Sequence, residues 1–401
     1  MTKNNSRRDF LKSAALTSGG LILGFNWFGN EALAAKVINN ISAEGNATFN
    51  AFLSIQSNGI VTILSPNPEV GQGIKTAFPI IVAEELDVDW ANVKVLQAPL
   101  DAKKFERQVA GGSGSIPHSW QRLRKAGATA RQMLIGAAAK RWGVPTSECS
   151  TSKSFVIHTS GKKLGYGELA AEAAQITPPT DVKLKDIKDF KLIGSTIKGV
   201  DNQDILTGKP LFGIDFYREG MLFSMIQRPP AFGLKLKSFD ATAAKALPGI
   251  VDVISFKDKV AIVGKSTWEV KKARDLVKIE WEESATLESS DDHNRIFKEL
   301  LDGKTEVRRK DGDIETAFKD AAKIVEAEYQ CPFLPHNPME PMNFFAHVRA
   351  DGAELVGPTQ TPQNAQNQTA KLLNIPADKV TVELTRMGGG FGRRLDRKSV
   401  V

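Results

Sequence analysis

The sequence predicts a mixed α/β fold of the α+β class, divided into several domains. Segments with the two-residue period of strands alternate along most of the chain with segments that have the 3.6-residue period of helices. The chain has 401 residues, which is more than one domain usually holds. Two charged stretches, residues 176–207 and 284–312, interrupt the pattern. We expect the first to be a linker and the second a surface connector.

The N-terminus has the pattern of a twin-arginine export signal. Arg7 and Arg8 precede an apolar pair and then a weakly apolar, uncharged stretch over residues 13–30. Residues 32–34 read Ala-Leu-Ala, the small-residue pattern that a signal peptidase cleaves. The stretch barely reaches spanning length and is diluted by glycines, so cleavage is favoured over the alternative of a membrane anchor. We expect residues 1–34 to be removed and the mature protein to reach a bacterial periplasm.

Residues 35–175 are predicted to form the first folded domain. Asn58-Gly59 supplies the positive φ angles of a tight turn, so the apolar runs on either side are expected to form a hairpin. From Lys75 the apolar period becomes that of a helix. The predicted elements are strands 52–55, 60–64 and 93–97, helices 75–86 and 119–142, a hairpin of 155–158 with 163–166, and a short helix 167–174.

Residues 208–283 and 313–401 are predicted to form two further domains. Ser266 and Glu269 have the capping-box pattern of a helix start, and Thr361-Pro362 fits an N-cap followed by a proline in the first helical position. The predicted elements are strands 222–227, 251–255, 260–263 and 277–281 with a helix from Ser266, then strands 325–329, 344–349, 354–356 and 379–386 with a helix over 361–374.

Three glycine-rich loops are the candidate ligand-binding features. They are residues 71–73 (Gly-Gln-Gly), 110–115 (Ala-Gly-Gly-Ser-Gly-Ser) and 388–392 (Gly-Gly-Gly-Phe-Gly). Such loops let backbone N–H groups approach an anion, and a helix that follows adds a favourable dipole. Arg393 and Arg394 follow the third loop and can pair with phosphate. Taken alone, each loop is more often a structural turn, and the third lacks the spacing of a dinucleotide-binding fingerprint.

Composition limits the chemistry that side chains alone can supply. Cys149 and Cys331 lack Cys-x-x-Cys spacing, and two cysteines cannot hold an iron–sulfur cluster, which usually takes four thiolates. They could pair in a disulfide in an oxidising periplasm or stay free. The histidines have no metal-ligand spacing. A net charge of +7 suits an anionic ligand or a solvated surface, but the basic residues are dispersed, so nucleic-acid binding is not expected. Redox chemistry would need a bound cofactor.

The three loops and their flanking residues together resemble a known family. Residues 69–76 (Glu-Val-Gly-Gln-Gly-Ile-Lys-Thr), 339–341 (Met-Glu-Pro) and 386–392 (Arg-Met-Gly-Gly-Gly-Phe-Gly) are similar to segments of the molybdenum-binding large subunit of the xanthine dehydrogenase/aldehyde oxidase family. Residues 208–281 look like its small α/β hammerhead domain. Here the Gly-Gln-Gly segment lies upstream of Gly-Gly-Gly-Phe-Gly, a permuted order that resembles the isoquinoline 1-oxidoreductase β-subunit branch.

The resemblance implies a fold, a cofactor and partners. The fold is that of a molybdenum hydroxylase large subunit, with a hammerhead domain at residues 208–283 and molybdopterin-binding segments at 35–175 and 313–401. The cofactor is a molybdopterin in its cytosine dinucleotide form, with the metal held by the pterin and not by side chains. The implied activity is hydroxylation of an aldehyde or an N-heterocycle carbon with oxygen from water. Electrons would leave through 2Fe–2S clusters of a separate small subunit.

The resemblance also assigns site residues. Gln72 is expected to bond an oxo ligand of the metal, and the backbone at Phe391 and Gly392 to approach the metal and the pterin. Residues 112–115 are expected to cradle the pterin or its phosphates, and Glu340 to be structural. The implied cofactor-binding set is Gly71, Gln72, Gly73, Gly112, Ser113, Gly114, Ser115, Gly389, Gly390, Phe391, Gly392 and Arg393, with Gln72 and Phe391 as its catalytic members.

The family's general base is expected to lie outside this chain. It is a glutamate close to the C-terminus of the large subunit, and general-base catalysis typically contributes about 10²–10⁴-fold. The chain ends at Val401, soon after the third loop. We therefore expect a C-terminally truncated chain, or one completed by a separately encoded part, that is inactive alone. The alternative is a catalytically dead exported fragment or binding module that retains the fold.

Overall fold

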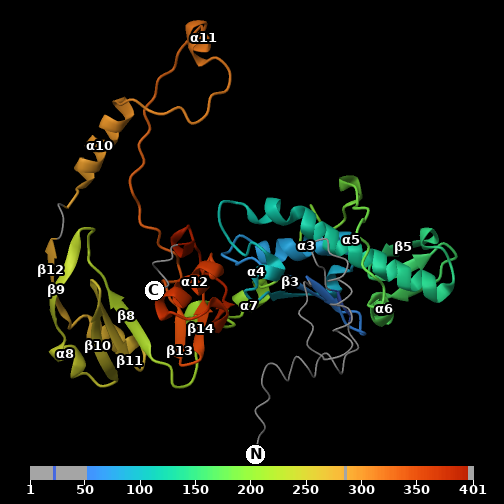
Figure 1. Ribbon diagram of the computed structural model, residues 1–401, viewed down its shortest axis with the longest axis horizontal. Coiled ribbons are helices and arrows are strands. Elements are labelled where there is room, and N and C mark those ends of the chain that lie inside the picture. The colour runs from blue at the N-terminus through green and yellow to red at the C-terminus, as the bar shows by residue number, and fades with distance from the viewer. Residues whose placement is uncertain (1–20, 24–51, 284–286, 396–401) are drawn as a thin grey trace, which may run out of the picture. The chain divides into compact units, whose positions relative to one another are not determined.

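The computed structural model describes residues 21–23, 52–283 and 287–395 (Figure 1). One compact unit is formed by Met1–Phe216 with Leu334–Val401, and a second by Tyr217–Phe333. Most of the predicted signal lies outside the described residues, although β1 (Leu21–Leu23) falls within it and pairs antiparallel with β2 (Leu53–Ile55). No helix in the described ranges is long and apolar enough to cross a membrane.

A β–α–β unit carries the first glycine loop. β3 (Val61–Ser65) and β4 (Val93–Gln97) pair in parallel, and α3 (Ile74–Leu86) connects them. β2 pairs antiparallel with β3, and Gly59 in the turn between them has the positive φ, 86°, that a tight hairpin requires. The hairpin, the helix and the strand predicted for this stretch are therefore confirmed.

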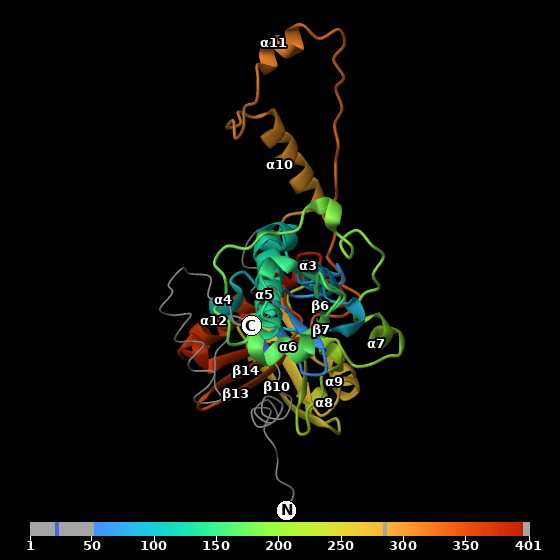
Figure 2. The same cartoon turned by 90° about the vertical axis from the view of Figure 1, so that its right-hand side faces the viewer.

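Helices α3 and α5 (Ser115–Trp142) cross in direct contact, as two views at right angles show (Figures 1 and 2). Gly127 of α5 lies at the crossing, where a Cβ atom would come within 2.3 Å of the carbonyl oxygen of Val82. Only glycine allows so close an approach of two backbones. The predicted helix over 119–142 is confirmed, but it begins earlier, at Ser115, so the second glycine loop leads directly into its N-terminus.

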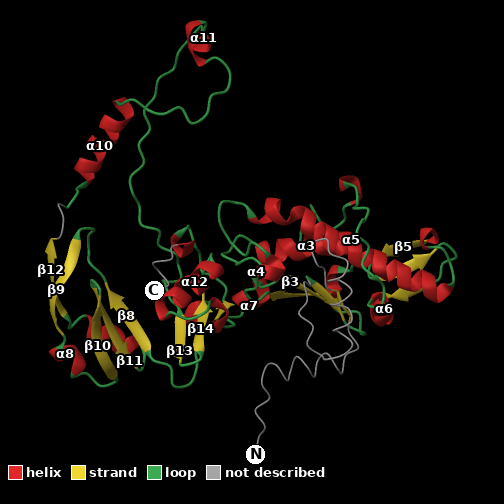
Figure 3. Ribbon diagram, in the orientation of Figure 1, coloured by secondary structure: helices red, strands yellow, loops and turns green. Residues whose placement is uncertain are grey.

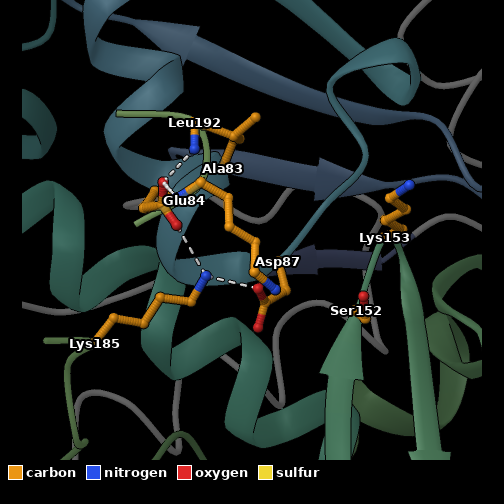
Figure 4. A pocket seen from close by; sticks show the side chains of 8 residues that line it. Ala83, Glu84, Asp87, Ser152, Lys153, Lys185 and Leu192 are labelled. Atoms are coloured by element: carbon orange, nitrogen blue, oxygen red, sulfur yellow. Dashed lines mark hydrogen bonds and ion pairs between the residues drawn. The ribbon is translucent and has the colours of Figure 1, made fainter. Parts of the chain in front are cut away.

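Residues 183–201, called the strap below, run along α3 and are held by its carboxylates. Glu84 is buried, and one of its oxygens accepts hydrogen bonds from the backbone N–H groups of residues 191–193 at 2.6–3.0 Å. Lys185 bridges Glu84 and Asp87 at 3.0 and 2.6 Å beside a small hollow (Figure 4). Burial raises the pKa of Glu84, but these hydrogen bonds outweigh it and leave the pKa below its ordinary value. The strap lies in the stretch predicted as a linker and is packed onto the first unit.

A second sheet of the first unit leads into the third glycine loop. β14 (Gly352–Gly357) pairs antiparallel with β13 (Phe345–Arg349) and parallel with β15 (Val380–Leu384), and α12 (Pro362–Leu373) connects β14 to β15. The three strands and the helix confirm the prediction. The unit also contains α4 (Ala102–Phe105), β5 (Cys149–Ser152), β6 (Phe155–His158), β7 (Lys163–Gly165), α6 (Tyr166–Ala173) and α7 (Asn202–Leu206).

Residues 217–283 of the second unit form two small antiparallel sheets (Figure 3) and two short helices. The sheet orders are β10-β11-β8 and β12-β9. Ser266 caps α9 as predicted, because its hydroxyl accepts from the backbone N–H of Glu269 at 3.2 Å. The elements are β8 (Phe223–Gln227), β9 (Leu234–Asp240), α8 (Thr242–Lys245), β10 (Ile250–Phe256), β11 (Lys259–Gly264), α9 (Thr267–Arg274) and β12 (Lys278–Glu283), of which β9 and α8 were not predicted.

Residues 287–333 of the second unit form an arm with two helices, α10 (Ser290–Asp302) and α11 (Ile314–Lys319). The strand predicted over 325–329 is wrong, because this stretch is extended but has no strand partner among the described residues. Val325, Tyr329 and Phe333 are 79%, 90% and 75% exposed. An alternating pattern predicts the conformation of a strand, but a strand forms only where a neighbour supplies the hydrogen-bond ladder.

Candidate functional site

The first and third glycine loops meet in the first unit. The backbone N–H of Met387, at the start of the third loop, donates to the carbonyl of Glu69 in the first at 3.1 Å. A Cβ atom at Gly390 would lie 3.5 Å from a methyl group of Val70. Two segments separated by about three hundred residues therefore lie side by side.

The second loop joins the other two through buried amide side chains. Asn67 donates from its side-chain nitrogen to the hydroxyl of Ser115 at 2.9 Å and to the carbonyl of Val109 at 3.0 Å. Gln360 and Ala110 exchange two hydrogen bonds: the N–H of Ala110 donates to the Gln360 carbonyl at 3.0 Å, and the Gln360 side-chain nitrogen donates to the Ala110 carbonyl at 2.6 Å. All three predicted loops thus converge on one place.

Gln360 is the site residue that the sequence analysis missed. It lies between β14 and α12, is 5% exposed, and its side-chain oxygen has no hydrogen-bond partner in the described structure. That oxygen is 2.7 Å from the position of a Cβ atom at Gly390, so it points at the third loop. A buried acceptor without a partner is costly, which favours a ligand donor at this position. The available signal in the sequence was a Thr-Gln pair that follows β14 after one proline.

Gln72 occupies a different environment from the one that its predicted role requires. It is exposed, and its amide folds back onto its own loop. The side-chain oxygen accepts from the N–H of Val70 at 2.7 Å, and the side-chain nitrogen donates to the carbonyl of Pro68 at 3.1 Å. In this structure Gln72 shapes the loop, and its role toward a ligand stays a prediction.

The buried side chain of Glu69 fixes the conformation of the first loop. It is 3% exposed, and its carboxylate accepts from the N–H groups of Gly71, Gly73 and Lys75 at 2.8–3.0 Å. Gly71 and Gly73 have φ angles of 101° and 83°, which glycine adopts without strain. In the sequence, Glu69 is distinguished only as the first residue of the 69–76 motif. In the structure, its carboxylate holds the loop closed by accepting from three of the loop's backbone N–H groups.

The second loop combines a helix N-terminus with a cation. Gly112 and Ser113 have positive φ angles of 61° and 52°, and α5 starts two residues later. Arg107 donates to the carbonyl of Gly111 at 3.2 Å, while its other terminal nitrogen is buried with no partner among the described residues. A Cβ atom at Gly114 would lie 3.4 Å from this guanidinium. A free helix N-terminus beside an arginine is suited to a phosphate.

The third loop is tied down by Glu340 and Arg394. The Glu340 carboxylate accepts from the N–H of Gly388 at 2.8 Å and from Arg394 at 3.0 Å, and Arg394 also donates to the Gly389 carbonyl at 2.9 Å. Glu340 is therefore structural, as expected. Arg394 is fully buried in this network, which corrects the expectation that it pairs with phosphate. Burial lowers its pKa, although the nearby Glu340 charge opposes that effect.

Of the remaining predicted residues of the third loop, Gly390 is buried, whereas Phe391 and Gly392 at the tip are exposed. Phe391 has a positive φ of 49° and is 69% exposed. Gly389 and Gly392 also have positive φ, at 99° and 83°. Arg393 is partly exposed and makes no ion pair with the residues that the structure describes. The tip of this loop presents backbone, one aromatic ring and one available cation.

Side chains of the described residues form no cluster of three or more histidine, cysteine, aspartate or glutamate groups that could hold a metal ion. Cys149 and Cys331 are both free thiols.

Comparison with protein-family models identifies what these loops belong to. Residues 24–204 and 294–400 each match a molybdopterin cofactor-binding domain. The first matched range contains the first two glycine loops and the second contains the third, so the loop junction is made by both matched domains. The fold and the site define a molybdopterin-binding protein.

Curated relatives narrow this class. The chain is 30% identical to the isoquinoline 1-oxidoreductase subunit beta of Brevundimonas diminuta over 99% of its own length and 57% of the relative's. It is 29% identical to a membrane-bound aldehyde dehydrogenase of Gluconacetobacter polyoxogenes, named for pyrroloquinoline quinone, over 98% of this chain and 52% of that one. The chain belongs to the molybdopterin-binding subunits of the xanthine dehydrogenase/aldehyde oxidase family. The family and the mixed α+β fold predicted from the sequence are confirmed.

The chain spans about half the length of these relatives. It is also similar to the solved quinoline 2-oxidoreductase of Pseudomonas putida 86, at 19% identity and a TM-score of 0.41, over 52% of this chain and 32% of that one.

Proposed function

We propose that this chain is the molybdopterin-binding part of an oxidoreductase that hydroxylates an aldehyde or an N-heterocycle carbon. The observation that carries this proposal is the convergence of three glycine loops, the second and third of which contact Gln360, whose buried side-chain oxygen has no partner among the described residues. The family models and the curated relatives named for isoquinoline and aldehyde oxidation support it.

The residues at the junction fit a flat, anionic cofactor. A Cβ atom at Gly71, Gly73, Gly112 or Gly392 would touch nothing within 4 Å, so the backbone is open at all three loops. Gln360 offers a buried acceptor for a ring N–H, which a pterin has and a simple phosphate lacks. Arg107 and Arg393 offer cations to a phosphate group.

When bound, a molybdopterin would supply two-electron oxidation of a carbon that receives oxygen from water. The chain's own residues would bind and orient it. Gln360 would fix the ring through its side-chain oxygen, and the N–H groups of the second loop with Arg107 would hold the phosphate end. Phe391 and the neighbouring backbone would border the reacting face. Glu69 and Glu340 would act indirectly, because they shape the loops.

The wider assembly is part of the same proposal. Electrons would pass to a separate 2Fe–2S subunit, as the family resemblance implies, and the two cysteines of this chain are too few to ligate such a cluster themselves. The nucleotide form would be the cytosine dinucleotide. Arg7-Arg8 and the cleavage pattern at 32–34 support export by the twin-arginine machinery to the periplasm. That route fits a protein that must be folded around its cofactor before it crosses a membrane.

Cofactor analysis of the purified chain tests the proposal. The protein would be expressed in a molybdopterin-producing host and assayed for molybdenum, for cytidine monophosphate released by hydrolysis, and for pyrroloquinoline quinone. We expect molybdenum and cytidine monophosphate at near one per chain. A Gln360→Met variant should lose most of the molybdenum. Gln363→Met should retain it, because among the described residues the Gln363 amide donates only to Gln366 and Asn367 on its own helix.

Two other outcomes would overturn parts of the proposal. Wild-type protein that contains the quinone and no molybdenum would exclude the molybdopterin reading and favour the chemistry in the second relative's name. Folded wild-type protein that contains neither would favour a binding module that retains the fold without the cofactor. Protein that contains molybdenum would be assayed for isoquinoline and aldehyde oxidation with an artificial electron acceptor. The assay would be repeated after adding the part of a relative that this chain does not cover, expressed as a separate polypeptide.

A further inference from the structure

We infer that Asp201 is a positioning residue that sets the first and third glycine loops against each other. Asp201 lies at the end of the strap, far from both loops in sequence, and no family motif singled it out. It is 8% exposed. The inference rests on the proposed function, because it concerns the geometry of the same cofactor site.

One carboxylate is shared by the two loops. Lys75, which follows the first loop, donates to both Asp201 oxygens at 2.8 and 2.9 Å. Arg386, which precedes the third loop, donates to one of those oxygens at 2.9 Å. Asp201 therefore bridges the two chain segments whose glycines form the junction.

The neighbouring backbone strengthens this brace. The N–H of Val200 donates to the hydroxyl of Thr76 in α3 at 3.0 Å, and the N–H of Arg386 donates to the carbonyl of Leu211 at 3.0 Å. Residues 200–211 thus contact both loop ends through main-chain hydrogen bonds as well as through Asp201. The segment is a fixed spacer between the loops.

The charge of Asp201 is needed as much as its shape. Lys75 and Arg386 side chains are each 18% exposed, so water screens them only in part. The other anion nearby is Glu69, which lies 3.9 Å from Arg386 and already accepts three backbone N–H groups. Without the Asp201 charge, two partly buried cations would repel each other across the loops.

An isosteric variant and a matched control test the inference. Asp201→Asn keeps the shape and removes the charge. Asp204→Asn removes the charge of a neighbour whose pair with Lys209 is solvent-exposed, with side chains 39% and 58% accessible. Hydrogen–deuterium exchange of the cofactor-free proteins would be followed in peptides covering residues 66–77 and 384–395, together with the urea midpoint.

We expect Asp201→Asn to exchange roughly tenfold faster in both peptides, while peptides of the second unit exchange at the wild-type rate. Asp204→Asn should match the wild type, and Asp201→Glu should restore part of the protection. Molybdenum retained after gel filtration should fall in Asp201→Asn relative to the wild type. Unchanged exchange in both loop peptides, or equal acceleration throughout the chain, would overturn the inference. Wild-type protein without molybdenum would instead refute the proposed function, and the exchange comparison would still decide the role of Asp201.

Discussion

The crossing of α3 and α5 offers a sharp test of how much stability depends on the close approach of these two helices. Gly127→Ala would place a Cβ atom 2.3 Å from the carbonyl oxygen of Val82 and 2.9 Å from Cβ of Glu85. Ordinary contact starts near 3.4 Å, so the two helices would have to separate by about 1 Å. Overpacking of this kind typically costs about 1–3 kcal/mol and more where backbone atoms clash.

A competing effect lowers the net cost of this substitution. Alanine is about 1 kcal/mol more favourable than glycine inside a helix. We expect a net destabilisation of about 2 kcal/mol, seen as a lower urea midpoint with an unchanged slope. Gly136→Ala in the same helix is the matched control, because its Cβ would meet only the mobile end of the Ile176 side chain at 3.0 Å. That variant should be neutral or slightly stabilised. Equal stability of Gly127→Ala and wild type, or equal losses in both variants, would refute the argument.

Three other predictions concern buried polar groups. The pKa of Glu84 is lowered in the folded state, so its contribution to stability is present above its unfolded pKa and is lost as pH falls through the folded value. Glu84→Gln should therefore flatten the acid side of a plot of unfolding free energy against pH. An unchanged acid side would contradict this. Glu69→Gln should weaken three charge-assisted hydrogen bonds and speed proteolysis within residues 68–75, whereas the exposed Glu172→Gln should not. Tyr166→Phe removes a buried hydrogen bond of 2.6 Å to the Leu86 carbonyl and should cost about 1 kcal/mol in urea unfolding; no measurable loss would show that the bond is replaced.

Periodicity and turn chemistry predicted most elements of the fold. The Asn58-Gly59 hairpin, helix α3 and the capped helix α9 rest on local signals, and the structure contains each of them. The strand predicted over 325–329 failed because alternation specifies a conformation but not a partner. Helix α10 was missed because its many charges made residues 284–312 read as a surface connector.

The site was predictable in its parts but not in its assembly. The three loops could be recognised as glycine runs, but their meeting depends on hydrogen bonds between segments far apart in sequence. Gln360 carried no local signal strong enough to single it out, because its burial arises only when Ala110 and Gly390 fold against it. Arg393 and Arg394 are neighbours of identical chemistry, and only the fold separates an available cation from one enclosed by Glu340.

The arm of the second unit has a consequence for the behaviour of the protein in solution. Its extended stretch alternates Val325, Ala327, Tyr329, Cys331 and Phe333 with polar residues, and the large apolar members are exposed. Such a stretch is a template for pairing with another extended chain, and so a site of self-association. Glu326 and Glu328 alternate with these apolar residues in the sequence, and their like charges would oppose the pairing of two copies of the stretch. Higher ionic strength screens those two charges and should therefore increase self-association at this stretch, which light scattering of the chain would detect.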